Sequence, residues 1–131
     1  SVWGAIMTLD QYDAFCGALP ATTYVVQWGG SPVWKVGGKV FAIGRQVKTD
    51  ASSGYPAFSF KVSEHNFQVL PEHSSYRPAP YLASRGMKWI QQFNAPSSED
   101  GELEYYLTES HRIVSLGLSK KKQRELGLNQ D

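Results

Sequence analysis

The sequence contains a single cysteine, so no disulfide can form within the chain. Cys16 falls in an apolar pattern of helical spacing, which predicts a small buried side chain and not a reactive thiol. The chain has no apolar run near the ~20 residues that span a membrane, and its first residues lack the basic region of a signal peptide. These absences predict a soluble, cytoplasmic protein.

An excess of charge of one sign is also missing, because 13 Lys and Arg against 12 Asp and Glu give a net charge of +1. A nearly neutral chain argues against a general binder of polyanions. The charge is nevertheless uneven: residues 24–92 carry +5, whereas residues 1–23 and 93–131 each carry −2. The middle of the chain is therefore predicted to present a basic surface that attracts phosphates.

Familiar catalytic and metal-binding patterns are absent. Gly37–Lys39 looks like the end of a phosphate-binding P-loop, but valines replace its first glycine and its hydroxyl residue. Gly29–Val33 lacks the last glycine of a hydrolase nucleophile elbow. The three histidines, His65, His73 and His111, have no metal-ligand spacing. We therefore expect no catalytic residue, no metal site and no cofactor.

Strand-forming residues dominate Tyr24–Arg45, where two Gly-Gly pairs separate three runs rich in β-branched and aromatic residues. This pattern is typical of a three-stranded antiparallel meander. A two-residue turn at Gly37–Gly38 would pair Val36 with Lys39, Trp34 with Phe41 and Pro32 with Ile43. That register predicts a core face formed by Trp34, Val36, Phe41 and Ile43. It also predicts a thinner face, open to solvent or a ligand, formed by Val33, Lys35, Val40 and Ala42.

Helices are predicted around these strands. Thr8 is suited to cap a first helix, which Pro20 ends, and Ser63 is suited to cap a short helix that runs through Leu70. An amphipathic helix follows Pro96–Asp100 and runs to about Leu116, and Lys120–Leu126 forms one more short helix.

Further strands are expected at Pro56–Val62, Tyr81–Ala83 and Lys88–Phe93, the last two as a hairpin with Arg85 at its tip. Residues 1–6 are interpreted as an extension or cloning remnant, and residues 7–131 as a single domain.

Cations interleaved with aromatic residues are the remaining candidate site. Lysines at strand ends often serve only to discourage edge pairing, but basic hairpin tips can also contact DNA phosphates. The candidate nucleic-acid-binding residues are Lys35, Lys39, Arg45, Lys48, Arg77, Arg85 and Lys88. Trp34 and Trp89 are predicted to anchor the core, with base stacking as the alternative.

Several segments resemble, in the same order, the MmcQ/YjbR family of small bacterial proteins. The resemblance extends from Met7 to Arg124 and departs from the family pattern at His111, where a tyrosine is common. The matching segments are Leu19–Pro20, Pro32–Ala42, Phe60–Val62, Arg77–Tyr81, Lys88–Ile90 and the last long helix with Leu107, Ser110 and Arg112.

This resemblance implies an α+β fold in one compact domain, in which helices pack on an antiparallel sheet in the order α-β-β-β-β-α-β-β-α. In that family the fold is described as a double wing that binds DNA, and its topology is similar to that of secretion chaperones. We therefore expect a non-enzymatic DNA-binding protein. The alternatives are a chaperone-like module that binds protein segments and, third, an enzyme or small-ligand binder.

Overall fold

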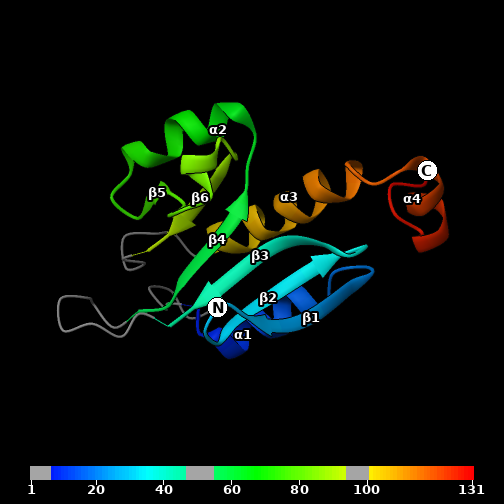
Figure 1. Cartoon of the computed structure of the whole chain (residues 1–131), viewed down its shortest axis with the longest axis horizontal. Helices are drawn as coiled ribbons and strands as arrows, with labels where there is room; N and C mark the ends of the chain where they lie inside the picture. The colour runs from blue at the N-terminus through cyan, green and yellow to red at the C-terminus, as the bar shows by residue number, and fades with distance from the viewer. Residues whose placement is uncertain (1–6, 47–54, 94–100) are drawn as a thin grey trace.

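The computed structural model describes residues 7–46, 55–93 and 101–131, and it contains one antiparallel sheet with helices on it (Figure 1). The strands are β1 (Thr22–Gln27), β2 (Ser31–Val36), β3 (Lys39–Arg45), β4 (Ala57–Lys61), β5 (Tyr76–Pro78) and β6 (Trp89–Gln92). The helices are α1 (Leu9–Gly17), α2 (Glu64–Val69), α3 (Glu102–Leu116) and α4 (Lys120–Leu126), with short 3-10 turns η1 (Leu70–Glu72) and η2 (Ala83–Arg85). The strand order is β1-β2-β3-β4-β6-β5. The predicted α+β class is confirmed.

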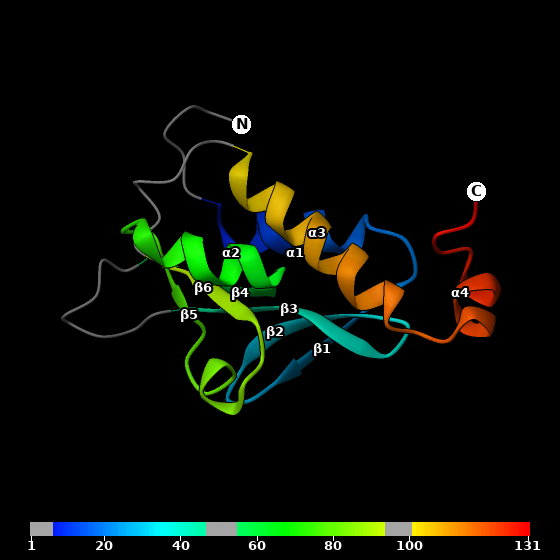
Figure 2. The same cartoon turned by 90° about the horizontal axis from the view of Figure 1, so that it is seen from above.

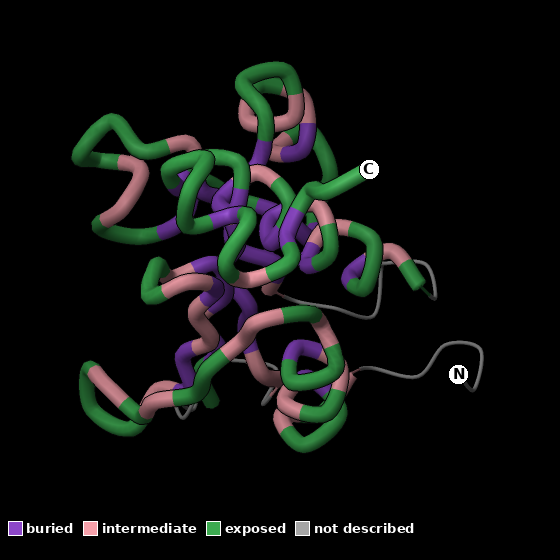
Figure 3. Tube along the Cα trace, turned by 90° about the vertical axis from the view of Figure 1, so that its right-hand side faces the viewer, coloured by how far each residue is buried: buried purple, intermediate pink, exposed green. Residues whose placement is uncertain are grey.

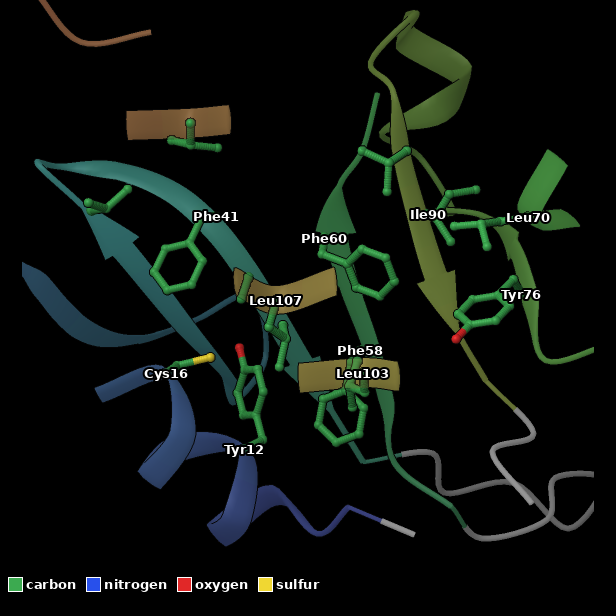
Figure 4. Close-up of a cluster of buried hydrophobic side chains, with 14 of the residues drawn as sticks. Tyr12, Cys16, Phe41, Phe58, Phe60, Leu70, Tyr76, Ile90, Leu103 and Leu107 are labelled. Atoms are coloured by element: carbon green, nitrogen blue, oxygen red, sulfur yellow. The ribbon is translucent and has the colours of Figure 1, made fainter. Parts of the chain in front are cut away.

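Helices α1, α2 and α3 lie on the same side of the sheet, as Figure 2 shows. The hydrophobic core fills the space between these two layers (Figure 4), and buried positions concentrate there while the turns are exposed (Figure 3). Tyr12 of α1 packs on Phe58 of β4 with ring centroids 5.0 Å apart. Phe60 stacks on Tyr106 of α3 at 5.5 Å. One face of the sheet is thus committed to the core.

Capping residues set the helix starts where the sequence predicts them. The Thr8 hydroxyl accepts a hydrogen bond from the N–H of Gln11, whose side chain bonds back to the N–H of Thr8. Ser63 and Ser119 cap α2 and α4, where their hydroxyls accept from the N–H groups of Asn66 and Lys122. The predicted start of the long helix at Pro96–Asp100 falls outside the described residues, as do residues 1–6.

The β2–β3 hairpin contains a bulge that the sequence-based register does not include. The turn lies at Gly37–Gly38 as expected, but the predicted pairing of Trp34 with Phe41 is wrong. The observed partners beyond the turn are Trp34 with Ala42 and Val33 with Ile43. Phe41 is therefore an extra residue, and every later β3 residue changes face, so Ile43 leaves the core face and Ala42 joins it.

The side chain of Ser110, on α3, hydrogen-bonds to the backbones of β3 and β4 next to this bulge. The Ser110 hydroxyl accepts a hydrogen bond from the Lys61 N–H at 2.8 Å and donates one to the Phe41 carbonyl at 2.6 Å. Ala42 pairs with Phe60, so Phe41 and Lys61 lie opposite each other one residue further along. A regular ladder would join these two backbone groups directly, and Ser110 bridges them instead.

Of the two strands predicted for the second hairpin, Tyr81–Ala83 and Lys88–Phe93, the structure contains only the second, as β6. Tyr81–Ala83 is a turn that leads into η2, and the strand that pairs with β6 is β5, at Tyr76–Pro78. A proline-containing strand is tolerated there because β5 is at the edge of the sheet. Arg85 consequently ends a 3-10 turn and is not the tip of a two-stranded hairpin.

Candidate nucleic-acid interface

Alternate strand residues point away from the helices and form what we call the open face. Trp34 and Phe60 face the helices, since Trp34 bonds to Asp13 of α1 and Phe60 belongs to the core. Their neighbours along the strands therefore face the other way. By the observed register, the open face consists of Thr23, Val25, Gln27, Ser31, Val33, Lys35, Val40, Ile43, Arg45, Ala57, Ser59, Lys61, Arg77, Trp89 and Gln91. Its centre is covered, because Val33, Ala57, Ser59, Trp89 and Gln91 are buried.

Cations gather on the open face without any acid. Lys35, Arg45, Lys61 and Arg77 come from four different strands, and none of the six strands contains Asp or Glu. The acids of the described segments lie in or beside the helices or at the C-terminus. The one ion pair within these segments joins Arg112 to Glu109 on α3 at 2.9 Å. The two layers of the molecule thus differ in the sign of their charge.

The guanidinium of Arg77 is held in place on this face. Its Nε donates to the Gln91 Oε1 at 2.8 Å, and its Cζ lies 4.3 Å from the centroid of the Phe93 ring. A stacked and hydrogen-bonded guanidinium loses less side-chain freedom when it binds a phosphate. The terminal nitrogens of Arg77 make no hydrogen bond or ion pair within the described residues.

Lys35 on β2 and Lys61 on β4 are separated by β3, so the usual spacing of strands puts them roughly 10 Å apart. Lys35 is opposite Val40 on β3, and Lys61, the last residue of β4, lies on the other side of β3, where its backbone N–H bonds to Ser110. Charges about 10 Å apart are largely screened from one another at physiological ionic strength. The open face can therefore hold both lysines, which are partly exposed, at little electrostatic cost.

The predicted candidate residues do not all lie together. Lys35, Arg45 and Arg77 are on the open face, and η2, which carries Arg85, lies on the same side of the sheet (Figure 2). Lys39 follows the β2–β3 turn, where Gly37 abuts Leu118 and Leu126 beside α4. The Nζ of Lys88 lies 5.0 Å from the Phe67 ring of α2, on the helix side. Lys48 is outside the described residues.

Both predicted tryptophans are packed within the molecule. The indole N–H of Trp34 donates to the Asp13 carboxylate at 2.9 Å, beneath α1. Trp89 is 3% exposed, so its ring offers no surface to a base. Its indole N–H has no hydrogen-bond partner in the described part of the chain. A buried donor without a partner is uncommon in folded proteins.

Lys61 is a member of the open face that the sequence analysis missed. The available signal was the alternation of β4, because Phe58 and Phe60 share the core face and Lys61 must then point the other way. The sequence analysis also did not include Trp28 and Tyr81, whose aromatic side chains are exposed, among the candidate site residues. Both have a left-handed backbone conformation, which could not be predicted from the sequence.

The buried thiol and one buried phenol of the described segments are both held in their neutral forms. Burial raises the pKa of the Cys16 thiol, which favours its neutral, unreactive form. Burial likewise raises the pKa of the Tyr12 hydroxyl, which donates to the Pro32 carbonyl. Within these segments, no group of three or more His, Cys, Asp or Glu side chains could hold a metal ion, and no helix is long and apolar enough to cross a membrane.

Comparisons with known proteins agree with the fold and extend over most of the chain. Protein DR2400 of Deinococcus radiodurans, which carries the domain DUF419, superposes with a TM-score of 0.77 at 22% identity, over 94% of this chain and 90% of that one. A protein from Pseudomonas syringae superposes with a TM-score of 0.66 at 14% identity, over 82% and 98%. No curated protein matches the sequence. The family model YjbR matches residues 17–113, and the chain belongs to the YjbR family.

Proposed function

We propose that this protein is a non-enzymatic DNA-binding protein that contacts backbone phosphates through its open face. The observation that carries the proposal is the set of four cations on strands that, in the described part of the chain, contain no acid: Lys35, Arg45, Lys61 and Arg77. Contacts to phosphates supply most of the affinity of proteins that bind DNA with little sequence preference. The acidic helices α1, α2 and α3 face away, so the field of these two layers would orient the open face toward a polyanion, although the basic helix α4 beyond one end of the sheet carries a further net +3 (Figure 2).

A titration of fluorescently labelled duplex DNA at several salt concentrations tests the proposal. With about four phosphate contacts, the logarithm of the binding constant should fall with the logarithm of salt concentration at a slope near −3.6. The absence of binding at about 50 mM salt, or a binding constant that does not change with salt, would refute the proposal.

Single substitutions locate the contacts. Lys35→Gln and Lys61→Gln should each make the slope shallower by about 0.9, because each removes one phosphate contact. Lys88→Gln is the matched control, since Lys88 lies over Phe67 on the helix side and should leave the slope unchanged. Equal losses in all three variants would mean that net charge alone, and not the open face, determines binding.

A second candidate function rests on the edge strand β1. Among the described strands, β1 pairs only with β2, and its Tyr24 and Val26 side chains are about half exposed. An unpaired edge with apolar side chains can accept an added strand from another protein, as in modules that bind protein segments. A protein partner captured through β1 would stay bound at about 1 M salt, where contacts to phosphates are lost.

A further inference from the structure

Two aromatic side chains project from the turns at opposite edges of the open face. Trp28, between β1 and β2, is 63% exposed, and Tyr81, before η2, is 80% exposed, more than any other large hydrophobic residue of the described segments. Scattered exposed hydrophobic residues are ordinary in soluble proteins. Exposure alone therefore does not assign Trp28 and Tyr81 a role, but both also have an unusual backbone conformation.

Both residues have a left-handed backbone, with φ of +50° at Trp28 and +69° at Tyr81. Bulky L-residues rarely adopt this conformation, and strain of this kind concentrates at ligand-binding positions. A serine three residues later donates its hydroxyl to the carbonyl in both cases, from Ser31 to Trp28 at 3.4 Å and from Ser84 to Tyr81 at 2.6 Å. The same local device thus occurs twice, each time under an exposed aromatic ring.

The two turns lie on the side of the sheet opposite to the helices (Figure 2). In that view they extend beyond β3 and β4, which carry Arg45 and Lys61. By strand order the β1–β2 turn and the β5–β6 connection are about four strand spacings, or about 20 Å, apart across the sheet, and the register also places them at opposite ends of the strands. Trp28 and Tyr81 therefore flank the cations of the open face from its two ends.

We propose that the open face binds a single-stranded stretch of DNA, with bases stacked on Trp28 and Tyr81 and phosphates on the cations between them. This inference rests on the proposed function and specifies the form of the ligand. A duplex hides the faces of its bases, whereas a single strand presents them to aromatic side chains. A span of at least about 20 Å accommodates several nucleotides, within the range of sites of other single-strand-binding folds.

A membrane surface is the other ligand that combines aromatic and basic contacts. The geometry favours a strand, because a flat surface that touches both turns would leave the cations of β3 and β4 set back from it (Figure 2). A flexible chain can reach the aromatic rings and these cations together.

The test compares three labelled DNAs by fluorescence anisotropy: a single strand, its duplex, and an abasic strand with the same number of phosphates. Trp28→Asn and Tyr81→Asn should each weaken binding of the single strand by about five-fold to about 100-fold and leave the abasic strand within about two-fold. Asn tolerates the left-handed backbone, so both variants should melt at or above the wild-type temperature. Tyr105→Asn is the control, because Tyr105 is 58% exposed on α3.

The outcomes separate this inference from the proposed function. Tighter binding of the single strand than of the duplex, with loss only in the Trp28 and Tyr81 variants, supports it. Tighter binding of the duplex, or unchanged affinity in both variants, overturns the inference and leaves the proposed function standing. If wild-type protein binds none of the three DNAs, both fall. Binding to phosphatidylserine vesicles that depends on Trp28, without binding to DNA, would assign the face to a membrane surface.

Discussion

Replacing Ser110 by alanine should strongly destabilise the fold, because one hydroxyl satisfies two buried backbone groups. Ser110 is fully buried, and its hydroxyl bridges the Lys61 N–H and the Phe41 carbonyl. Leaving a buried donor or acceptor without a partner costs about 1–3 kcal/mol. Alanine has a higher helix propensity than serine, which stabilises α3 by about 0.4 kcal/mol. With two such groups, the expected loss in the free energy of unfolding is therefore about 2–5 kcal/mol.

Urea unfolding followed by circular dichroism and tryptophan fluorescence measures this loss. For a domain of this size the midpoint should fall by about 1–2 M. Thr108→Ala is the control on the same helix, because the Thr108 hydroxyl is exposed and bonds only to the Glu104 carbonyl; it should change stability by less than about 0.5 kcal/mol. If Ser110→Ala matched this control, the strands would have closed to form the direct bond, and the bridging role would be refuted.

Three further predictions concern packing and burial. Asp13→Ala should cost about 1–2 kcal/mol in unfolding experiments, because it removes the acceptor of the Trp34 indole N–H, whereas Asp13→Asn, which retains a carbonyl acceptor, should cost less. Gly37→Ala should cost about 2–4 kcal/mol, since φ is +58° and the added Cβ would lie 2.6 Å from Leu118. Burial raises the pKa of Cys16 above its ordinary 9.0, so the thiol ionises first in the unfolded chain. Wild-type stability should therefore decline by up to about 1.4 kcal/mol per pH unit above about pH 9, relative to Cys16→Ala, as pH-dependent urea unfolding would show.

Local signals in the sequence account for most of the fold. The serine and threonine caps, the Gly-Gly turn and the alternation of β4 each depend on a few neighbouring residues, and each lies where it was predicted. The resemblance to the YjbR family supplied the order α-β-β-β-β-α-β-β-α, which the structure confirms as far as α3 and extends by α4.

The predictions of the β2–β3 register and of the strand that pairs with β6 were wrong because the local sequence patterns there are ambiguous. Val40–Ile43 is apolar throughout, so alternation cannot show which residue is extra, and the bulge depends on contacts with Ser110 of α3. β5 has only three residues and ends in a proline, which hides it from any strand pattern.

The candidate site was predictable only in part for a related reason. Lys35, Arg45 and Arg77 come together because β5 pairs with β6, and β6 with β4, and this order cannot be read from local sequence. The left-handed backbone of Trp28 and Tyr81 is likewise not encoded by any pattern of neighbouring residues, because glycine or asparagine is the usual choice there.

The most direct test of the account is to follow the backbone amide signals of the protein by NMR while single-stranded DNA is added at low salt. The account predicts that the largest shifts fall on the open face, at Lys35, Ile43, Ser59, Lys61 and Gln91, and in the turns of Trp28 and Tyr81. The exposed side of α3, including Tyr105 and Thr108, should not shift. Shifts confined to α3, to α4 or to the free edge of β1, or no shifts at all, would contradict the assignment of the open face as the DNA-binding surface.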